Sequence, residues 1–278
     1  MRIETNKHFV NPPFNYTGSK IKLLDQILPL FDYTKNNFVD LFCGGGSVYT
    51  NVLDKYEKIL ANDIISDLIE IHKKLLNSPN EFITLVENLA STKYDQQKFL
   101  NLRETYNNNK SPEGLYALML CCTNNMIRFN LKNEFNSTWG KRQFNEKTRE
   151  KLNIFVNHIS KYKEKIEYSS KNFYDIKLQE SSMIYCDPPY TNAEAGYNSY
   201  WNKNLENKLY LYLKKMDNDG HSFALSGLLG EHKNNKRSEI VDNLISDGFN
   251  YKILDHNYEA VARRKNSKNS VEIIIFNY

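Results

Sequence analysis

The sequence predicts an α/β fold in which a mainly parallel sheet is interrupted by a helical insertion. Short apolar runs recur along the chain with helical patterns between most of them, as in strands joined by crossover helices. The second and third runs are about 100 residues apart, too far for one crossover, and helical patterns fill that stretch. The last run follows its predecessor with no helix between them, which predicts an antiparallel final strand.

The elements are expected in the following order. Seven strands are predicted, at Phe38–Phe42, Lys58–Ala61, Ile166–Ser169, Met183–Cys186, Ser222–Leu225, Tyr251–Leu254 and Val271–Phe276. Helical patterns accompany them at Lys20–Leu30, Ser47–Tyr56, Leu205–Met216 and Arg237–Ser246. The insertion contains four more, at Ser66–Asn77, Pro79–Leu89, Asp95–Tyr106 and Pro112–Cys122. We therefore expect a sheet domain formed by residues 1–64 and 167–278, and a helical domain formed by residues 65–166.

Positive charge is concentrated in one segment. The 278 residues carry a net charge of +4, but residues 124–165 alone carry +6, which leaves the remainder at −2. Local basicity of this kind is typical of a protein that binds a phosphate backbone. For Lys161–Lys165 a solvated helix face is the simpler interpretation.

Metal binding and membrane insertion are not expected. The four cysteines form no C-x-x-C pair and the six histidines form no H-x-x-x-H pair, so we predict no metal and reduced thiols. No apolar stretch approaches the roughly 20 residues of a membrane helix, and the first residues lack the apolar core of a signal peptide. The composition therefore predicts a cytoplasmic protein, and nothing in it indicates an obligate protein partner.

The tetrapeptide Asp187-Pro188-Pro189-Tyr190 follows a run that reads as a buried strand. Ligand crevices of open α/β sheets lie beyond the carboxyl ends of the strands. Asp187 can accept a hydrogen bond from an amino group, and Pro188 offers a carbonyl without an N–H. Tyr190 offers a flat face for a planar ring. Together they suit the exocyclic amino group of adenine or cytosine, although an ordinary Pro-Pro turn remains the alternative.

A glycine-rich turn follows the first predicted strand. Gly44, Gly45 and Gly46 allow the backbone to approach a ligand, and the expected helix after Ser47 would favour an anionic group at its start. Asp63 ends the second strand, 23 residues beyond Asp40, where an acid can accept both hydroxyls of a ribose. Because the pattern is not G-x-G-x-x-G, it favours a nucleoside ligand without pyrophosphate.

These motifs together resemble a known family. Phe38-Val-Asp-Leu-Phe-Cys-Gly-Gly-Gly, Asn62-Asp63 and Asp187-Pro-Pro-Tyr190 resemble the Dam-type (D12 class) DNA adenine-N6 methyltransferases, which use S-adenosylmethionine. Phe14-Asn-Tyr-Thr-Gly-Ser-Lys20 looks like their N-terminal cofactor segment. Asn125-Met-Ile-Arg-Phe-Asn130 and Trp139-Gly-Lys-Arg142 are similar to their DNA-recognition hairpin, closest to that of the small phage-type members.

The resemblance implies a fold, an activity and two partners. The sheet would be the Rossmann-like class I methyltransferase sheet of seven strands, and the insertion a target-recognition domain carrying a β-hairpin. The activity would be direct methyl transfer from S-adenosylmethionine to N6 of an adenine flipped out of double-stranded DNA, with GATC as the target. The catalytic residues would be Asp187, Pro188 and Tyr190.

Cofactor and DNA contacts are also implied residue by residue. The cofactor residues would be Tyr16, Lys20, Asp40, Phe42, Gly44, Gly45, Asp63, Phe173 and Asp187. The DNA-binding residues would be Met126, Arg128, Asn130, Lys141, Arg142, Tyr197 and Trp201. Arginine that forms two hydrogen bonds with guanine is the commonest base-specific contact, so Arg128 and Arg142 are the expected base readers.

Other residues are expected to position the DNA. Met126 or the 130–135 turn would fill the gap left by the flipped base, and Tyr197 or Trp201 would cap that base. Trp201 could equally be a packing residue at a helix start. Phosphate contacts are expected from Lys132, Lys141 and Lys147, and the basic loop Arg263–Lys268 could be another or a plain loop.

Two rival functions remain open on the sequence. One is amino methylation of another substrate, such as another short DNA site, cytosine N4 or RNA, because related tetrapeptides serve several such enzymes. The other is a DNA-binding module that has lost catalysis, against which the intact Asp187, Asp63 and glycine turn argue.

Overall fold

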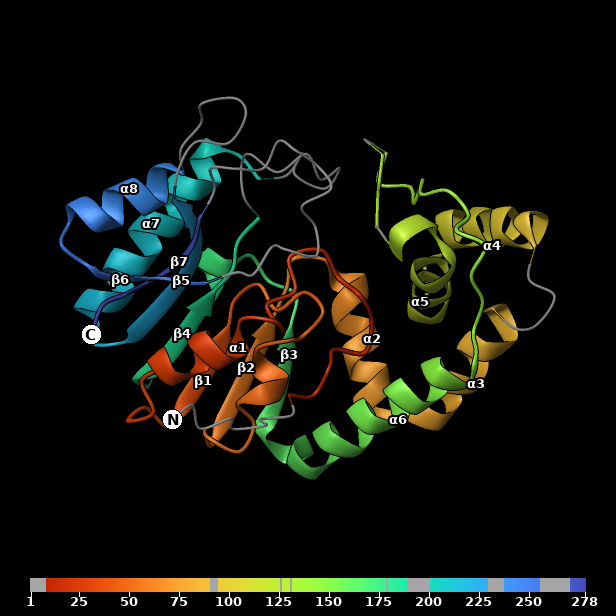
Figure 1. Ribbon diagram of the computed structural model, residues 1–278, viewed down its shortest axis with the longest axis horizontal. Helices are drawn as coiled ribbons and strands as arrows, with labels where there is room; N and C mark the ends of the chain where they lie inside the picture. The colour runs from red at the N-terminus through yellow and green to blue at the C-terminus, as the bar shows by residue number, and fades with distance from the viewer. Residues whose placement is uncertain are drawn as a thin grey trace.

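The computed structural model of the chain shows a sheet half and a helical half lying side by side (Figure 1). The structure describes residues 9–90, 95–125, 127–130, 132–178, 180–189, 201–229, 238–255 and 271–278. Strands with flanking helices form one half, and α3 to α6 lie in the other, as the labels in Figure 1 show.

The sheet has seven strands in the order β3-β2-β1-β4-β5-β7-β6. The strands are β1 (Asn37–Asp40), β2 (Lys58–Asn62), β3 (Ile166–Ser169), β4 (Ser182–Cys186), β5 (Ser222–Leu229), β6 (Asn250–Ile253) and β7 (Val271–Phe276). The pairs β1–β2, β1–β4, β2–β3 and β4–β5 are parallel, whereas β7 runs antiparallel to both β5 and β6. The predicted Rossmann-like sheet with an antiparallel last strand is confirmed.

Alternation along the strands divides the core into two apolar layers. Side chains on one face of the sheet, such as Val39, Leu41 and Ile273, pack with α7 (Lys203–Asn218) and α8 (Glu239–Ser246). Their neighbours Phe38 and Ile274 belong to the layer on the other face, with α1 (Leu24–Ile27). Because successive strand residues point to opposite faces, both faces are covered, as a mainly parallel sheet requires.

The helical half contains most of the insertion. The helices of the insertion are α2 (Ser66–Asn77), α3 (Pro79–Ala90), α4 (Gln96–Asn108), α5 (Pro112–Cys121) and α6 (Glu146–Ile159). The N-cap residues of α4, α5 and α6 are Asp95, Ser111 and Asn145. Their side chains accept hydrogen bonds from backbone N–H groups of the first turn. Such caps satisfy donors that the helix itself leaves free. Helix α6 was not among the expected helices.

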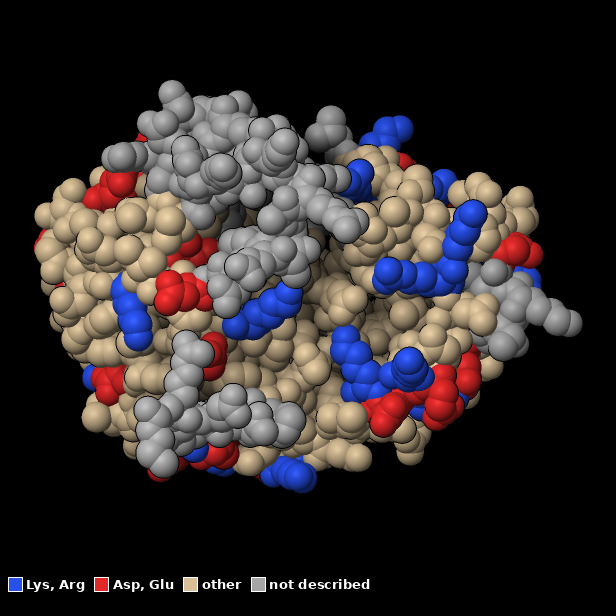
Figure 2. Space-filling model, in the orientation of Figure 1, with Lys and Arg blue, Asp and Glu red and all other residues tan. Residues whose placement is uncertain are grey.

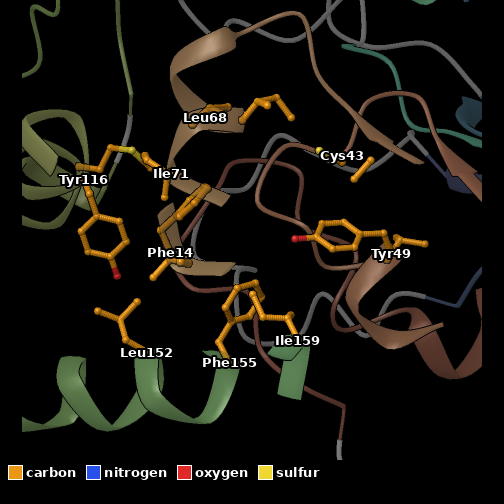
Figure 3. Packing of buried hydrophobic residues seen from close by; sticks show 14 of the residues in the cluster. Phe14, Cys43, Tyr49, Leu68, Ile71, Tyr116, Leu152, Phe155 and Ile159 are labelled. Atoms are coloured by element: carbon orange, nitrogen blue, oxygen red, sulfur yellow. The ribbon is translucent and has the colours of Figure 1, made fainter. Parts of the chain in front are cut away.

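One apolar cluster joins the two halves. Figure 3 shows Phe14 between Tyr116 of α5, Phe155 of α6 and Tyr49 of the sheet half. The Tyr116 hydroxyl donates to the Pro13 carbonyl at 2.8 Å, so the segment before α1 is fixed to the insertion. The insertion is therefore packed against the sheet half through a shared core.

The expected helix at Ser47–Tyr56 is wrong. Only a 3-10 turn forms there, at Tyr49–Asn51. Asn51 turns its carboxamide to the backbone of Val10, with its oxygen accepting from the N–H at 2.8 Å and its nitrogen donating to the carbonyl at 3.0 Å. Side chains that bond to backbone in this way compete with helix, and β-branched Val48 and Val52 disfavour it further. The argument for an anion site at a helix start after the glycines falls with it.

The segment between Cys122 and Trp139 forms a short antiparallel hairpin. Isolated bridges pair Cys122 with Trp139 and Phe129 with Phe135. The side-chain oxygen of Asn130 accepts from the N–H groups of Lys132 and Glu134 at 2.9 and 3.0 Å, which closes the turn between them.

The described ranges contain neither a helix that could cross a membrane nor a metal site. None of the helices in those ranges has the length and apolar character needed to cross a membrane. Within the same ranges, no three or more His, Cys, Asp or Glu side chains are grouped so as to hold a metal ion.

Candidate active site

Three carboxylates meet at the carboxyl ends of neighbouring strands. Asp40 ends β1 and pairs in register with Ala61 of β2 and Tyr185 of β4, so Asp63 and Asp187 each follow two residues beyond these partners. The chain leaves β1 toward β2 on one side and returns as β4 on the other, which makes this edge the topological switch point of the sheet. Crevices at such points are where open α/β folds bind ligands.

Asp187 is paired with a buried lysine from the N-terminal segment. Lys20 Nζ lies 2.8 Å from Asp187 Oδ2 and donates to the Gly18 carbonyl at 3.1 Å. Burial alone would lower the pKa of Lys20, but the charge of Asp187, further charges and the hydrogen bond to Asp187 together outweigh burial, and the pKa is raised. Lys20 is therefore an ammonium ion, and it holds Asp187 in place at the mouth of the crevice.

The glycine turn is fixed by Asp63. Gly44 has a φ of +47°, which favours glycine, and its N–H donates to Asp63 Oδ2 at 3.0 Å. Asp63 Oδ1 accepts from the N–H of Ile65 at 2.9 Å. Burial raises the pKa of Asp63 to about 6 in spite of these two hydrogen bonds. The second strand end and the glycine turn therefore form one rigid unit.

Tyr16 covers the glycine turn. A Cβ added to Gly44 would lie 2.8 Å from the Tyr16 ring, and one added to Gly45 would lie 3.0 Å from Tyr16 Cβ. The absence of a side chain at Gly44 and Gly45 is thus required by a close approach that any larger residue would block.

Asp40 has an unused acceptor at the carboxyl end of β1. Its Oδ2 accepts from the N–H of Tyr49 at 3.3 Å, whereas its buried Oδ1 has no hydrogen-bond partner among the described residues. Burial, and next the charge of Asp187, raises the pKa of Asp40 well above its usual range. An unpaired buried carboxylate oxygen is costly, so this position suits a ligand that brings a donor or a positive charge.

Three aromatic rings pack together beyond β1. The ring centroid of Phe42 lies 5.6 Å from that of Phe173 and 5.6 Å from that of Trp201. The planes of the Phe42 ring and the indole meet at 87°, in an edge-to-face arrangement. Trp201 and Phe173 are 6.1 Å apart. Of the residues expected to touch DNA, Trp201 thus lies with two of the residues expected to touch the cofactor.

A basic groove of about 770 Å³ runs between the N-terminal segment and the helical half. Its lining includes Lys141, Arg142, Lys147 and Lys151. On the face drawn in Figure 2, Lys and Arg side chains (blue) lie around the hollow between the two halves. Positive charge thus borders a concave surface that leads toward the glycine turn, because Phe14 lines the groove and Tyr16 covers the turn.

Asn125 organises this groove. Its side-chain oxygen accepts from Arg142 and, at 3.4 Å, from Asn15, while its nitrogen donates to the carbonyls of Met119 and Leu120. Lys151 donates to Asn15 at 3.3 Å, and burial lowers the pKa of this lysine. Asn15, Asn125 and Lys151 were not found from the sequence, because only the tertiary structure brings three distant segments together.

The remaining predicted residues are distributed as follows. Arg128 is exposed on the hairpin, and Asn130 is engaged in closing the turn. Pro188 is buried directly beyond β4. Tyr190, Met126, Tyr197 and the loop Arg263–Lys268 lie outside the described residues.

Comparison with known proteins points to one family. The sequence model described as "D12 class N6 adenine-specific DNA methyltransferase" matches residues 16–261. Modification methylase StsI of Streptococcus sanguinis is 33% identical over all of this chain and 44% of its own length. Type II methyltransferase M.FokI of Planomicrobium okeanokoites is 31% identical over all of this chain and 45% of its own length. A DNA adenine methylase of Serratia marcescens is 27% identical over 66% of this chain and 69% of its own length. The chain thus spans under half the length of the first two relatives.

Proposed function

The chain belongs to the D12 class of N6 adenine-specific DNA methyltransferases, and on that premise we propose that it methylates adenine N6 in double-stranded DNA with S-adenosylmethionine as donor. One observation carries the proposal. Asp187, which would hold the target amino group, and the Gly44–Asp63 unit, which would hold the donor, stand at the same edge of one sheet.

The crevice fits this cofactor. S-adenosylmethionine carries an ammonium and a sulfonium, and Asp40 presents a buried oxygen without a partner among the described residues. We propose that Asp40 accepts from the ammonium, that Asp63 accepts from the ribose, and that Phe42 and Phe173 contact the adenine ring. Tyr16 would cover the ligand where it already covers Gly44. The bound cofactor supplies an activated methyl group, so the protein needs alignment and electrostatics rather than a covalent nucleophile.

On the substrate side, the amino group must be held and its developing charge stabilised. We propose that Asp187 and the Pro188 carbonyl accept hydrogen bonds from its two N–H groups. The nitrogen lone pair is then directed at the methyl group. Lys20 supports this role by fixing one oxygen of Asp187 at 2.8 Å. The amino group is enclosed in a duplex, so the base must leave the stack. Tyr190 is proposed to stack on it, and Tyr197 or Trp201 to cap it.

DNA is proposed to follow the basic groove. Lys141, Lys147 and Lys151 would contact phosphates, which gives affinity without sequence preference. Arg142, held by Asn125, and Arg128 on the hairpin would read base edges. Insertion of the hairpin, with Met126 or the 130–135 turn, would fill the space of the flipped base.

GATC is the proposed target, by resemblance, and another short duplex site is the alternative. The relatives are named as a modification methylase, a type II methyltransferase and a DNA adenine methylase, which supports a DNA-modifying enzyme but specifies no target. Methylation of cytosine N4 is disfavoured, because the matching family is adenine-specific.

Methyl transfer to unmethylated plasmid by the purified chain tests the proposal. With radiolabelled S-adenosylmethionine, we expect incorporation into duplex DNA, and single-molecule sequencing should place N6-methyladenine at one short motif. GATC is tested in the same sample with restriction enzymes that distinguish its methylated and unmethylated forms. Label in cytosine would establish the alternative, and label in neither base, with a folded protein, would refute the proposed activity.

A further inference from the structure

The carbonyl of Gly44 accepts a hydrogen bond from a histidine of the insertion. His72, in α2, is fully buried, and its Nε2 lies 2.9 Å from the Gly44 oxygen. The N–H of the same glycine is held by Asp63. The amide groups on both sides of Gly44 are therefore fixed, one by the end of β2 and one by the helical insertion.

The hydrogen bonds define the tautomer of this ring. A carbonyl can only accept, so Nε2 must carry the proton, and the other ring nitrogen is then a bare acceptor. Nδ1 lies 3.1 Å from the hydroxyl of Tyr49, which donates to it. The Tyr168 hydroxyl, 3.0 Å from that of Tyr49, then donates in turn. Burial supports the neutral form, because it lowers the pKa of His72 to about 4.

The imidazole of His72 also packs against the glycine turn. A Cβ on Gly46 would lie 3.0 Å from His72 Cε1, and the imidazole stacks on Tyr168 at 5.7 Å with an 18° angle between planes. Tyr49, which comes from the chain just after the turn, projects its ring into the shared core (Figure 3). The histidine thus touches the turn, the segment after it and β3.

A purely packing role does not account for this arrangement. An apolar side chain would fill the same space without two buried polar atoms that need partners. The two ring nitrogens of His72 form hydrogen bonds with the Gly44 carbonyl and the Tyr49 hydroxyl. Neither bond is to a group of its own helix. In a trans peptide, the carbonyl and the following N–H point in opposite directions. Holding the Gly44 oxygen toward α2 therefore turns the N–H of Gly45 to the other side of the turn.

We propose that His72 is a positioning residue for S-adenosylmethionine: its Nε2–H holds the Gly44 carbonyl and so presents the Gly45 N–H to the cofactor. The inference rests on the proposed function. It makes the helical insertion, and not only the sheet half, responsible for the shape of the cofactor site.

Binding measurements on three variants test the role. His72→Phe keeps a ring of similar size but removes both hydrogen bonds, and we expect it to weaken S-adenosylmethionine binding about tenfold. The KM for the cofactor should rise to match, while kcat at saturating cofactor and the Kd for duplex DNA change less than about twofold. His72→Gln, whose amide nitrogen can reach the Gly44 oxygen, should recover most of the affinity. Tyr49→Phe, which removes only the donor to Nδ1, should weaken binding about threefold.

His221 supplies a matched control. It is also buried and accepts from the N–H of Ser182 at 3.1 Å, but at the amino end of β4, away from the crevice. His221→Phe should lower the melting temperature without changing the cofactor Kd. In the wild type, ¹⁵N NMR of labelled histidine should show His72 protonated at Nε2 and bare at Nδ1.

The possible outcomes separate the two proposals. Unchanged cofactor affinity in His72→Phe would overturn the inference, and if that variant does not fold, unchanged affinity in Tyr49→Phe would do so. Equal losses of cofactor and DNA affinity, or no recovery with glutamine, would also reduce His72 to a structural residue. A wild type that neither binds S-adenosylmethionine nor transfers methyl refutes the proposed function itself, independently of the variants.

Discussion

Asp187 and Lys20 form an ion pair that makes two separable contributions, one to stability and one to chemistry. The pair is largely withdrawn from water, with side chains 17% and 4% exposed, and its partners are 167 residues apart in the chain. Removing one member of a buried pair leaves an uncompensated charge, which typically costs about 3–5 kcal/mol. A loss of activity in a single variant is therefore ambiguous unless stability is measured beside it.

For this reason we expect Asp187→Ala both to abolish transfer and to lower stability. The double variant Lys20→Met/Asp187→Asn removes both charges and should recover stability while transfer stays at least about 100-fold below wild type. Thermal unfolding and radiolabel incorporation, measured on the same preparations, separate the effects. Substantial transfer by Asp187→Ala or by the double variant would remove Asp187 from catalysis.

Asp63 gives the molecule a pH dependence with a defined sign. Its pKa is raised from 3.8 to about 6 in the folded state, so the folded protein holds a proton between these values that the unfolded chain releases. The resulting stabilisation is complete below about pH 4 and is lost as pH rises through about 6, on the order of 3 kcal/mol in all. The same ionisation at neutral pH would supply the acceptor that we propose for the cofactor ribose.

Comparing wild type with Asp63→Asn isolates this contribution. Without ligand, the free energy of unfolding of the variant minus that of wild type should increase as pH rises from 4.5 to 7.5. A constant difference in stability between the two proteins does not affect this trend. In wild type, S-adenosylmethionine affinity should fall as pH drops below about 6. Parallel stability curves for the two proteins would show that Asp63 has an ordinary pKa.

At the scale of elements, the residues that we propose to read bases and those that we propose to contact phosphates lie at different places along the groove. Arg142 is held by Asn125 at the end of the hairpin, whereas Lys147 is exposed at the start of α6. Arg142→Ala should weaken the binding free energy for the preferred site by about 1–3 kcal/mol. The variant should also discriminate less between the correct base and other bases at that position. Lys147→Ala should weaken binding to all DNA sequences alike. It should also reduce the slope of log affinity against log salt concentration by about 1.

Arg149 is the matched control for these groove variants. It lies in the same basic segment, but it pairs with Glu87 and does not line the groove. Arg149→Ala should leave both the site preference and the salt slope unchanged. Unaltered discrimination in Arg142→Ala would exclude Arg142 from base reading.

The elements also show what the sequence could and could not predict. All seven strands were predicted near their observed positions. Strand β4 is fully buried and parallel to its neighbours, so it forms a continuous apolar run, whereas β6 is exposed and antiparallel to β7. The turn at Tyr49–Asn51 was mistaken for a helix, because the bond between Asn51 and Val10 joins residues 41 apart. Helix α6 was missed although Leu152, Phe155 and Ile159 are spaced along one helical face and Asn145 caps its start.

The candidate site divides in the same way. Asp187, Asp63, Asp40 and the glycine turn carry local patterns and were found from them. The partnership of His72 with Gly44, and that of Asn125 with Arg142, depend on distances between segments that only the tertiary structure sets. The roles of all these residues, with those of Tyr190, Tyr197 and Met126 and the cytoplasmic location, remain predictions.

At the scale of the whole molecule, the shared core predicts one unfolding transition. Phe14, Tyr116, Phe155 and Tyr49 belong to a single buried cluster, so neither half can lose its packing alone. S-adenosylmethionine at 100 times its Kd should stabilise the folded state by about 2.7 kcal/mol and raise the midpoint by several degrees. Calorimetry with and without the cofactor measures both. Two resolved transitions, with only one shifted by ligand, would show that the halves unfold separately.

The shared core has a consequence for how such enzymes can diversify. A recognition module that is tethered by a linker can be exchanged whole between scaffolds, but here α2 holds the Gly44 carbonyl of the glycine turn and α5 fixes the segment before α1. Grafting a foreign insertion would remove both supports at once. New target preferences should therefore arise by point changes along the groove and the hairpin, and chimaeras that exchange residues 65–166 as a block should fail at folding before selectivity can be assayed.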